Sequence, residues 1–205
     1  LEEKVLVEEK EELKEEENQL VKLKDDYQNN DIKAILSIPG VNKEWIIPQG
    51  NDNNFYLRHL LNGTYDRNGT PFLDYRVNLD SSKKLLIYGH NSSKYEMPFD
   101  EVENYVNEDY LKKHPYLELK TEKEIRSFQV FSVYVETKDF SYYNKIKFLN
   151  DNDFYRHIKA LKNKSFYDTG VSIDKDDKIL ILQTCSTLSK YQNLKKKYLL
   201  VIAKE

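Results

Sequence analysis

Residues 179–185 read Ile-Leu-Ile-Leu-Gln-Thr-Cys, an apolar run that ends in Cys185, the only cysteine among the 205 residues. Almost a hundred residues earlier, a second apolar run, Leu85-Leu86-Ile87-Tyr88, ends in Gly89-His90-Asn91. Short apolar runs of this kind are typical of buried strands. If the two strands are neighbours, the thiol and the imidazole meet where the strands end, which is the arrangement that a cysteine-nucleophile enzyme requires.

The pair carries more information than either residue alone. A lone cysteine on a strand is more typical of an inert, buried small side chain, and a lone histidine is more typical of a structural one. A thiol enzyme also needs a donor for the charge that develops on the attacked carbonyl oxygen. Lys195-Lys196-Lys197 precede the last apolar run, Tyr198–Ala203, so a cation there would face the Cys185 end of a neighbouring strand. The alternative for these lysines is a solvated basic turn.

The rest of the chain predicts a β-rich domain with helical insertions. Helical periodicity covers residues 98–113 and 151–162. Short β-like runs separated by turn residues cover residues 35–38, 44–47, 55–57, 72–74, 85–88, 116–119, 127–135, 178–182 and 198–203. About eight strands with helices as insertions predict a mostly antiparallel β-barrel or sandwich.

The N-terminal residues differ from the remainder. Residues 1–30 hold eleven Asp or Glu against five Lys, a net of −6 in a chain of net charge −3. Residues 3–29 predict one charged helix whose Leu6, Leu13, Leu20 and Tyr27 recur every seven residues. This narrow stripe fits a helix on the flank of the domain, and the alternative is a coiled coil or a stalk. We therefore expect a helical extension over residues 1–30 and a catalytic domain over residues 31–205.

Composition and motifs argue against several other functions. The charge shows no concentrated basic face, so no nucleic-acid partner is expected. His59, His114 and His157 are scattered, and no HxxxH or CxxC spacing indicates a zinc site. Neither a GxSxG elbow nor a GxxxxGK[ST] loop is present, and no run of about 18 apolar residues predicts a membrane span. No cofactor is expected.

The two strand-end segments resemble known ones. Tyr88-Gly89-His90-Asn91, followed by Met97-Pro98-Phe99, resembles the histidine segment of sortases, particularly class B. Asp177–Cys185 resembles the strand that ends in their Thr-Leu-Ser-Thr-Cys motif. Further segments fit the class B pattern in order: Ile38-Pro39, Ile47-Pro48-Gln49, residues 53–57 and residues 69–74. The similarity covers roughly residues 31–204, and the N-terminal helix agrees with the helical extension of that class.

The resemblance implies an eight-stranded sortase β-barrel and a transpeptidase on the outer face of a Gram-positive cell, anchored in the membrane by a segment outside this sequence. In such enzymes the cysteine attacks the peptide bond after Thr in the C-terminal sorting signal of a surface protein. An amine, usually that of a peptidoglycan precursor, then resolves the thioester. Carried over, Cys185 is the nucleophile and His90 the proton donor to the leaving amine. Thr184 would line the substrate-threonine pocket or contact the oxyanion, and Asn91 and Tyr198 are expected to contact substrate.

Two positions depart from the family pattern. Gln183 stands where the family usually has Ser, and the family arginine at the start of the last strand is not evident. Aligning the aromatic residue that follows that arginine with Tyr198 puts Lys197 in its place, whereas aligning from Ala203-Lys204 puts Tyr198 there; Lys195 and Lys196 are the other candidates. We assign the catalytic cation to Lys197, which keeps the charge but loses the two-pronged donor geometry.

The missing arginine leaves a second hypothesis, a weakly active or inactive sortase-like module that binds sorting peptides or a cell-wall partner. A pilus-assembling sortase fits less well, because the long region between His90 and Cys185, with its helix at residues 151–162, resembles the wall-anchoring layout. Substrate specificity is expected from the loop at residues 136–150, which holds Phe140, Tyr142 and Tyr143.

Overall fold

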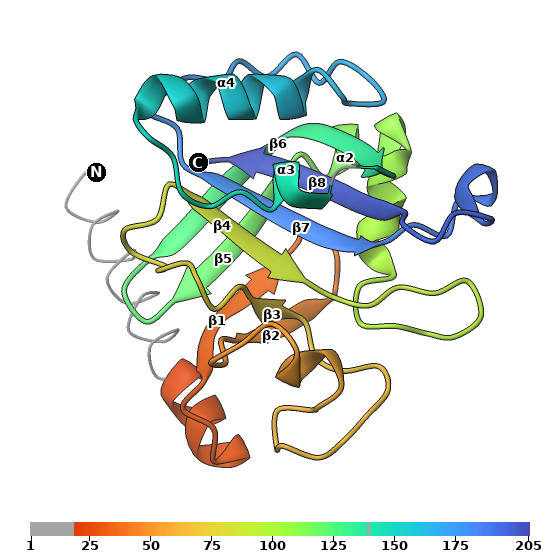
Figure 1. Ribbon diagram of the computed structural model, residues 1–205. Helices are drawn as coiled ribbons and strands as arrows, with labels where there is room; N and C mark the ends of the chain where they lie inside the picture. The colour runs from red at the N-terminus through yellow and green to blue at the C-terminus, as the bar shows by residue number, and fades with distance from the viewer. Residues whose placement is uncertain (1–18, 139) are drawn as a thin grey trace.

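The computed structural model describes residues 19–138 and 140–205, and eight strands in this part of the chain form one curved sheet (Figure 1). The strand order is β2-β1-β5-β6-β8-β7-β4-β3, and the terminal strands β2 and β3 contact each other, so the sheet curls into a nearly closed barrel. The strands are β1 (Ile32–Ser37), β2 (Glu44–Pro48), β3 (Phe72–Leu73), β4 (Lys84–Tyr88), β5 (Tyr116–Thr121), β6 (Ile125–Glu136), β7 (Ile179–Cys185) and β8 (Tyr198–Lys204). The predicted fold class is confirmed.

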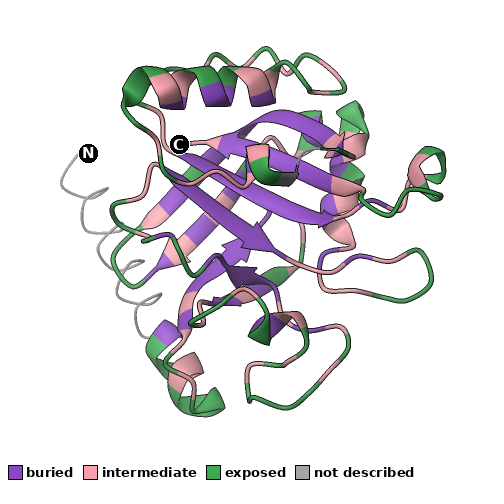
Figure 2. Ribbon diagram, in the orientation of Figure 1, coloured by how far each residue is buried: buried purple, intermediate pink, exposed green. Residues whose placement is uncertain are grey.

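The apolar runs are continuous because the central strands are covered on both faces. On β7, Leu180 and Leu182 point into the barrel interior, while Ile179 and Ile181 belong to a second core on the outer face. That second core is covered by α4 (Asp151–Lys162), which lies across one side of the sheet with its buried stripe facing the strands (Figure 2). A strand buried on both sides has no polar alternation, which explains the uninterrupted sequence Ile-Leu-Ile-Leu.

Helix α4 covers residues 151–162, as the sequence predicts. The Asn150 side chain caps it by accepting a hydrogen bond of 3.0 Å from the Asp153 N–H. Phe154, Ile158 and Leu161 form its buried stripe. The end of the helix and the amphipathic face are both local properties of the sequence, so both could be predicted.

Two other elements differ from expectation. The predicted helix over residues 98–113 is a 3-10 segment, η2 (Glu101–Val106), followed by a short helix, α2 (Glu108–Lys113). Asn107 separates them with extended backbone (ψ 120°) and caps α2. The prediction of a strand at residues 55–57 is wrong, because Phe55–Leu57 forms a 3-10 turn, η1. The Asp52 carboxylate accepts hydrogen bonds from the N–H groups of Asn54 and Phe55 and so bends the chain.

Short elements cover the rest of the described chain. Residues 19–27 are helical, and Leu20 is fully buried in a small core with Ile32 and Ile35 on β1, as expected of a helix on the flank. Leu6 and Leu13 of the predicted stripe lie outside the described residues. The remaining elements are α3 (Phe140–Tyr143) and η3 (Ser189–Tyr191). No helix within residues 19–138 and 140–205 is long and apolar enough to cross a membrane.

Strands β4 and β7 are neighbours, and their pairing positions the thiol and the imidazole. They run parallel with Tyr88 opposite Gln183, and the Gly89 N–H continues the ladder to the Gln183 carbonyl at 3.0 Å. The same register places His90 opposite Cys185. The other strand pairs of the described sheet are antiparallel.

Gly89 is required by the packing behind the histidine. A Cβ atom added to Gly89 would lie 2.5 Å from the Phe99 ring. The Phe99 N–H donates to the His90 carbonyl at 3.0 Å, so Phe99 cannot move without pulling on the residue that carries the imidazole.

We therefore expect Gly89→Ala to lower the free energy of unfolding by about 1–3 kcal/mol, the usual range for overpacking a filled core. Thermal unfolding measures this change. A substitution to Ala at the open position Gly63 adds a Cβ that meets no atom within 4 Å, although its backbone φ of +78° also favours glycine. If Gly89→Ala destabilises no more than Gly63→Ala, the steric argument is wrong.

Candidate active site

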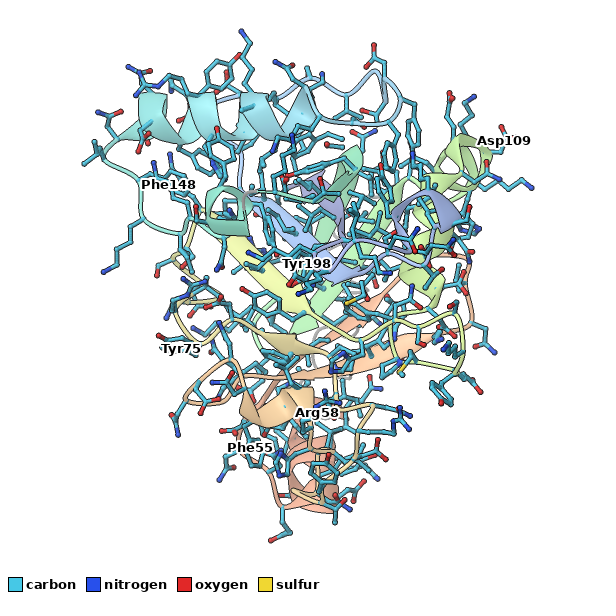
Figure 3. The ribbon with its side chains drawn as sticks, turned by 45° about the vertical axis from the view of Figure 1, so that its right-hand side comes forward. Phe55, Arg58, Tyr75, Asp109, Phe148 and Tyr198 are labelled. Carbon is cyan, nitrogen blue, oxygen red and sulfur yellow. The ribbon has the colours of Figure 1, made fainter. Side chains whose placement is uncertain are left out.

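Cys185 and His90 line one cleft of about 440 Å³ at the ends of β4 and β7. Its floor is one face of the sheet. This face carries Tyr88 on β4 and His90 just after that strand, Gln183 and Cys185 on β7, and Tyr198 on β8. Its walls come from the segment before β3, from the connection between β3 and β4, and from the loop after β6. Figure 3 shows Tyr198 over the strands and Tyr75 on a separate segment below it; Arg58, also labelled there, is not among the residues that line the cleft. The cleft is lined by Asn53, Asn54, Leu57, Phe72, Tyr75, Arg76, Tyr88, Gly89, His90, Asn144, Gln183, Cys185 and Tyr198.

The hydrogen bond of His90 fixes its tautomer. Nε2 lies 3.0 Å from the Leu57 carbonyl oxygen, which can only accept, so Nε2 carries the proton and Nδ1 is unprotonated in the neutral ring. Burial lowers the pKa of His90, the hydrogen bond to Leu57 opposes that effect, and the nearby charge of Arg58 adds to it. His90 is therefore a neutral imidazole at neutral pH, with Nδ1 available to take a proton.

The Cys185 side chain is a free thiol that is partly buried. Burial raises its pKa, the charge of Lys197 lowers it, and the charge of Glu103 raises it further. The resting site consequently holds a neutral thiol and a neutral imidazole. Within the described residues, no hydrogen bond joins the two side chains.

Glu103 joins the two loops that carry these residues. Its carboxylate accepts a hydrogen bond of 2.6 Å from Nδ2 of Asn91, the residue after His90. It also accepts one of 2.6 Å from the N–H of Thr187, two residues after Cys185. It also accepts from the hydroxyl groups of Ser186 and Thr187. Asn91 Nδ2 additionally donates to the Cys185 carbonyl at 3.2 Å. One carboxylate on η2 thus holds both strand ends, a role that the sequence did not reveal because these partners lie 12 to 84 residues away.

The other residues predicted for the site occupy different places. Tyr198 is the direct partner of Cys185 across the β7–β8 ladder and lines the cleft. Lys197 Nζ donates to the Gln192 carbonyl at 3.0 Å and does not line the cleft, so its influence on the thiol is that of a nearby charge. Thr184 is fully buried on the opposite face, where its hydroxyl donates to the Gly89 carbonyl at 2.8 Å, and Asn91 ties the two loops together.

Two polar residues of the cleft were not singled out from the sequence. Arg76, before β4, and Asn144, after α3, both line it. Arg76 belongs to no recognisable motif, whereas Asn144 lies in the loop at residues 136–150 from which substrate specificity was expected. No cluster of three or more His, Cys, Asp or Glu residues that could hold a metal ion occurs in residues 19–138 and 140–205.

Comparison with known proteins gives one consistent result. A family model described as Sortase domain matches residues 36–205. Sortase B of Listeria monocytogenes is 32% identical over 165 residues, which cover 80% of this chain and 66% of that protein. Sortase B of Staphylococcus aureus is 27% identical over 158 residues, covering 77% of this chain and 64% of that protein. The chain therefore spans just under two thirds of the length of these two curated relatives.

Solved structures agree with the sequence comparison. A mutant form of Clostridium perfringens sortase B superposes with a TM-score of 0.84 at 30% identity, covering 96% of this chain and 90% of that one. A complex of Staphylococcus aureus sortase B with substrate has a TM-score of 0.80 at 28% identity, covering 91% of this chain and 84% of that one.

Two substitutions should shift the pKa of the Cys185 thiol in opposite directions. Lys197→Met removes a charge that lowers this pKa, so the pKa rises; Glu103→Gln removes a charge that raises it, so the pKa falls. Gln keeps an acceptor for the Thr187 N–H, which preserves part of the network. The rate of alkylation by iodoacetamide as a function of pH measures both values. A shift of the same sign in both variants would show that loop disorder, rather than charge, controls the thiol.

Proposed function

The chain belongs to the sortase family, class B, and from this premise we propose that it is a cysteine transpeptidase. It cleaves a C-terminal sorting signal of surface proteins after Thr, forms a thioester at Cys185 and transfers the acyl group to a cell-wall amine. The observation that carries this proposal is the parallel β4–β7 register, which sets His90 opposite Cys185 in one cleft.

The proposed cycle moves one proton between the two residues. Because Nε2 of His90 is engaged by the Leu57 carbonyl, Nδ1 takes the proton from the thiol. The thiolate attacks the carbonyl carbon of the Thr, and the C–N bond to the next residue breaks as the imidazolium protonates the leaving amine. The incoming amine then attacks the thioester and gives a proton to the imidazole, which returns it to the departing thiolate. A new amide bond replaces the one that was broken.

The charge on the tetrahedral intermediate needs stabilisation, and we propose that Tyr198 supplies a hydrogen-bond donor and Lys197 a nearby positive charge. Tyr198 lies directly opposite Cys185 in the cleft, and Lys197 supplies a positive charge that lowers the pKa of the thiol. A lysine provides a charge without the planar fork of an arginine. Loss of one oxyanion donor costs about 10²–10³ in rate in other enzymes, so slow turnover is expected.

The partners follow from the family. A sortase B structure with bound substrate supports a sorting-signal peptide as the acyl donor, and we propose a peptidoglycan precursor amine as acceptor. The expected place of action is the outer face of a Gram-positive cell, with membrane anchoring by a segment outside this sequence.

One observation favours a second function, a weakly active or inactive module that binds sorting peptides or a cell-wall partner. Lys197 Nζ is bound to the Gln192 carbonyl rather than directed into the cleft. Peptide binding without a thioester at Cys185, across many peptides, would support this alternative. A gain of activity in Lys197→Arg would support the transpeptidase.

The transpeptidase proposal predicts a specific loss on substitution of the nucleophile. Incubation with a panel of Thr-containing sorting peptides and a triglycine amine should give a transfer product, and Cys185→Ala should abolish both cleavage and transfer. Mass spectrometry detects the acyl-enzyme and the product. Ser189→Ala, in the exposed turn after β7, serves as the control and should retain full activity. Cleavage that persists in Cys185→Ala would refute the assignment of the nucleophile.

The pH dependence of kcat/KM follows from the two shifted pKa values. The thiol and the imidazole must together carry one titratable proton for activity. Activity is lost below the pKa of His90, where both groups are protonated, and above the pKa of Cys185, where neither group is protonated. Since burial lowers the pKa of His90 and raises that of Cys185, the acid limb should lie below 6.5 and the alkaline limb above 9.0. An acid limb above 6.5 would mean that His90 is stabilised as a cation instead.

A further inference from the structure

Exposed aromatic rings gather on residues 55–65, here called the aromatic segment, and the proposed cycle does not use them. Phe55, which Figure 3 shows below the strands, is 41% exposed, and Tyr65 is 72% exposed. The His59 ring contacts both. It stacks on Phe55 at a centroid distance of 4.1 Å with the ring planes 1° apart, and it meets Tyr65 at 5.9 Å with the planes perpendicular. Single exposed apolar side chains are ordinary, whereas a group of them indicates a binding surface.

The backbone of the aromatic segment orders these rings before any ligand binds. His59 and Tyr65 form an antiparallel bridge, and within it the Leu60 N–H donates to the Thr64 carbonyl at 2.9 Å. The Thr70 hydroxyl donates to the His59 carbonyl at 3.0 Å and so ties the bridge to the chain that leads into β3. An ordered surface loses little conformational freedom when it binds a partner.

Polar and charged side chains flank the rings. Asn54, Arg58 and Asn62 are exposed. Arg58 Nη1 donates to the Arg67 carbonyl at 2.8 Å, and the Arg67 guanidinium lies over the Tyr95 ring at 4.6 Å. The surface therefore combines aromatic rings with hydrogen-bonding groups, and it is not one continuous apolar area.

This combination suits a sugar chain. The C–H groups on one face of a pyranose ring carry partial positive charge and pack on the negative face of an aromatic ring, while its hydroxyl groups bind polar neighbours. A protein partner would need a wider apolar centre inside a polar rim. A single-stranded nucleic acid would need a basic groove, which the charge distribution of the chain lacks.

The aromatic segment adjoins the cleft on its histidine side. Leu57, within the segment, lines the cleft, and its carbonyl oxygen lies 3.0 Å from His90 Nε2. In the proposed cycle the imidazole gives a proton to the leaving amine and takes one from the incoming amine, so both amines stand beside His90. A peptidoglycan precursor carries its sugars on the same molecule as its amine. The sugars of an acceptor bound at His90 would therefore extend over the aromatic segment.

We propose that the aromatic segment binds the glycan of the acceptor, a chain of N-acetylated amino sugars, by stacking on Phe55 and Tyr65. This inference rests on the proposed function, because it takes the cell-wall amine acceptor as the partner. The acceptor is then held at two places: its amine in the catalytic cleft and its sugars on the segment beside it.

Glycan binding can be measured without catalysis. Fluorescent chitotetraose, a short chain of N-acetylglucosamine, is titrated into Cys185→Ala protein, and fluorescence anisotropy gives Kd. Adding Tyr65→Ala or Phe55→Ala should weaken binding about 5-fold or more, whereas Tyr65→Phe keeps the ring and should bind as the parent does. Tyr116→Ala removes an exposed ring from β5 and should change nothing. Equal binding by all variants, or no binding of chitotetraose by the parent, would overturn the proposal.

Two acceptors separate this surface from the cleft in the transfer reaction. Triglycine has no sugar, whereas a disaccharide–peptide with a triglycine branch presents the same amine on a glycan. Tyr65→Ala should raise the KM for the glycan-bearing acceptor about 5-fold or more and leave kcat and the kinetics with triglycine unchanged. Equal effects on both acceptors, or none on either, would overturn the glycan surface. Chitotetraose binding that depends on Tyr65, in a protein that transfers no peptide, would refute the transpeptidase and retain the glycan surface.

Discussion

The parallel pairing of β4 with β7 is the constraint on which the rest of the site depends. Three hydrogen-bonded features extend the register to the loops: Tyr88 opposite Gln183, the Gly89 N–H on the Gln183 carbonyl, and the Thr184 hydroxyl on the Gly89 carbonyl. Both strands are buried on both faces, so the backbone positions from which the imidazole and the thiol project are held by packing. The loops beyond them are free to shape the cleft without moving the reacting atoms.

The electrostatics of the cleft oppose the chemistry that it is proposed to perform. Burial favours the neutral forms of both His90 and Cys185, so the thiolate–imidazolium pair is the minor form of the resting enzyme. Glu103 adds to this cost by raising the pKa of the thiol. The same carboxylate nevertheless binds Asn91 and Thr187, and so keeps the two strand ends together. Glu103 thus holds the two strand ends in place, and its charge at the same time lowers the fraction of Cys185 that is thiolate.

The sequence predicted the elements that depend on neighbouring residues, and it did not predict the contacts between residues that are far apart in the chain. The apolar runs before Gly89 and Cys185 predicted two buried strands, and the apolar periodicity of residues 151–162 predicted α4 with the bounds that the structure has. The 3-10 turn at Phe55–Leu57 was missed because the Asp52 carboxylate, rather than strand propensity, sets the backbone there. The contacts of Glu103 with Thr187 and of Arg76 with Asn144 join segments 84 and 68 residues apart, and neither leaves a pattern in one sequence.

The position of the family arginine shows why register matters more than residue type. Lys197 and Tyr198 are adjacent, so strand alternation sends their side chains to opposite faces, and only the β7–β8 ladder decides which one accompanies Cys185. The ladder selects Tyr198. Lys197 instead binds the Gln192 carbonyl in the loop between the two strands. The positive charge that lowers the pKa of the thiol therefore depends on the conformation of that loop, whereas the position of Tyr198 is set by the sheet. The stabilisation of the oxyanion that we propose is accordingly divided between a strand and a connecting loop, whereas an arginine on β8 would supply both the charge and the donor geometry from the strand alone.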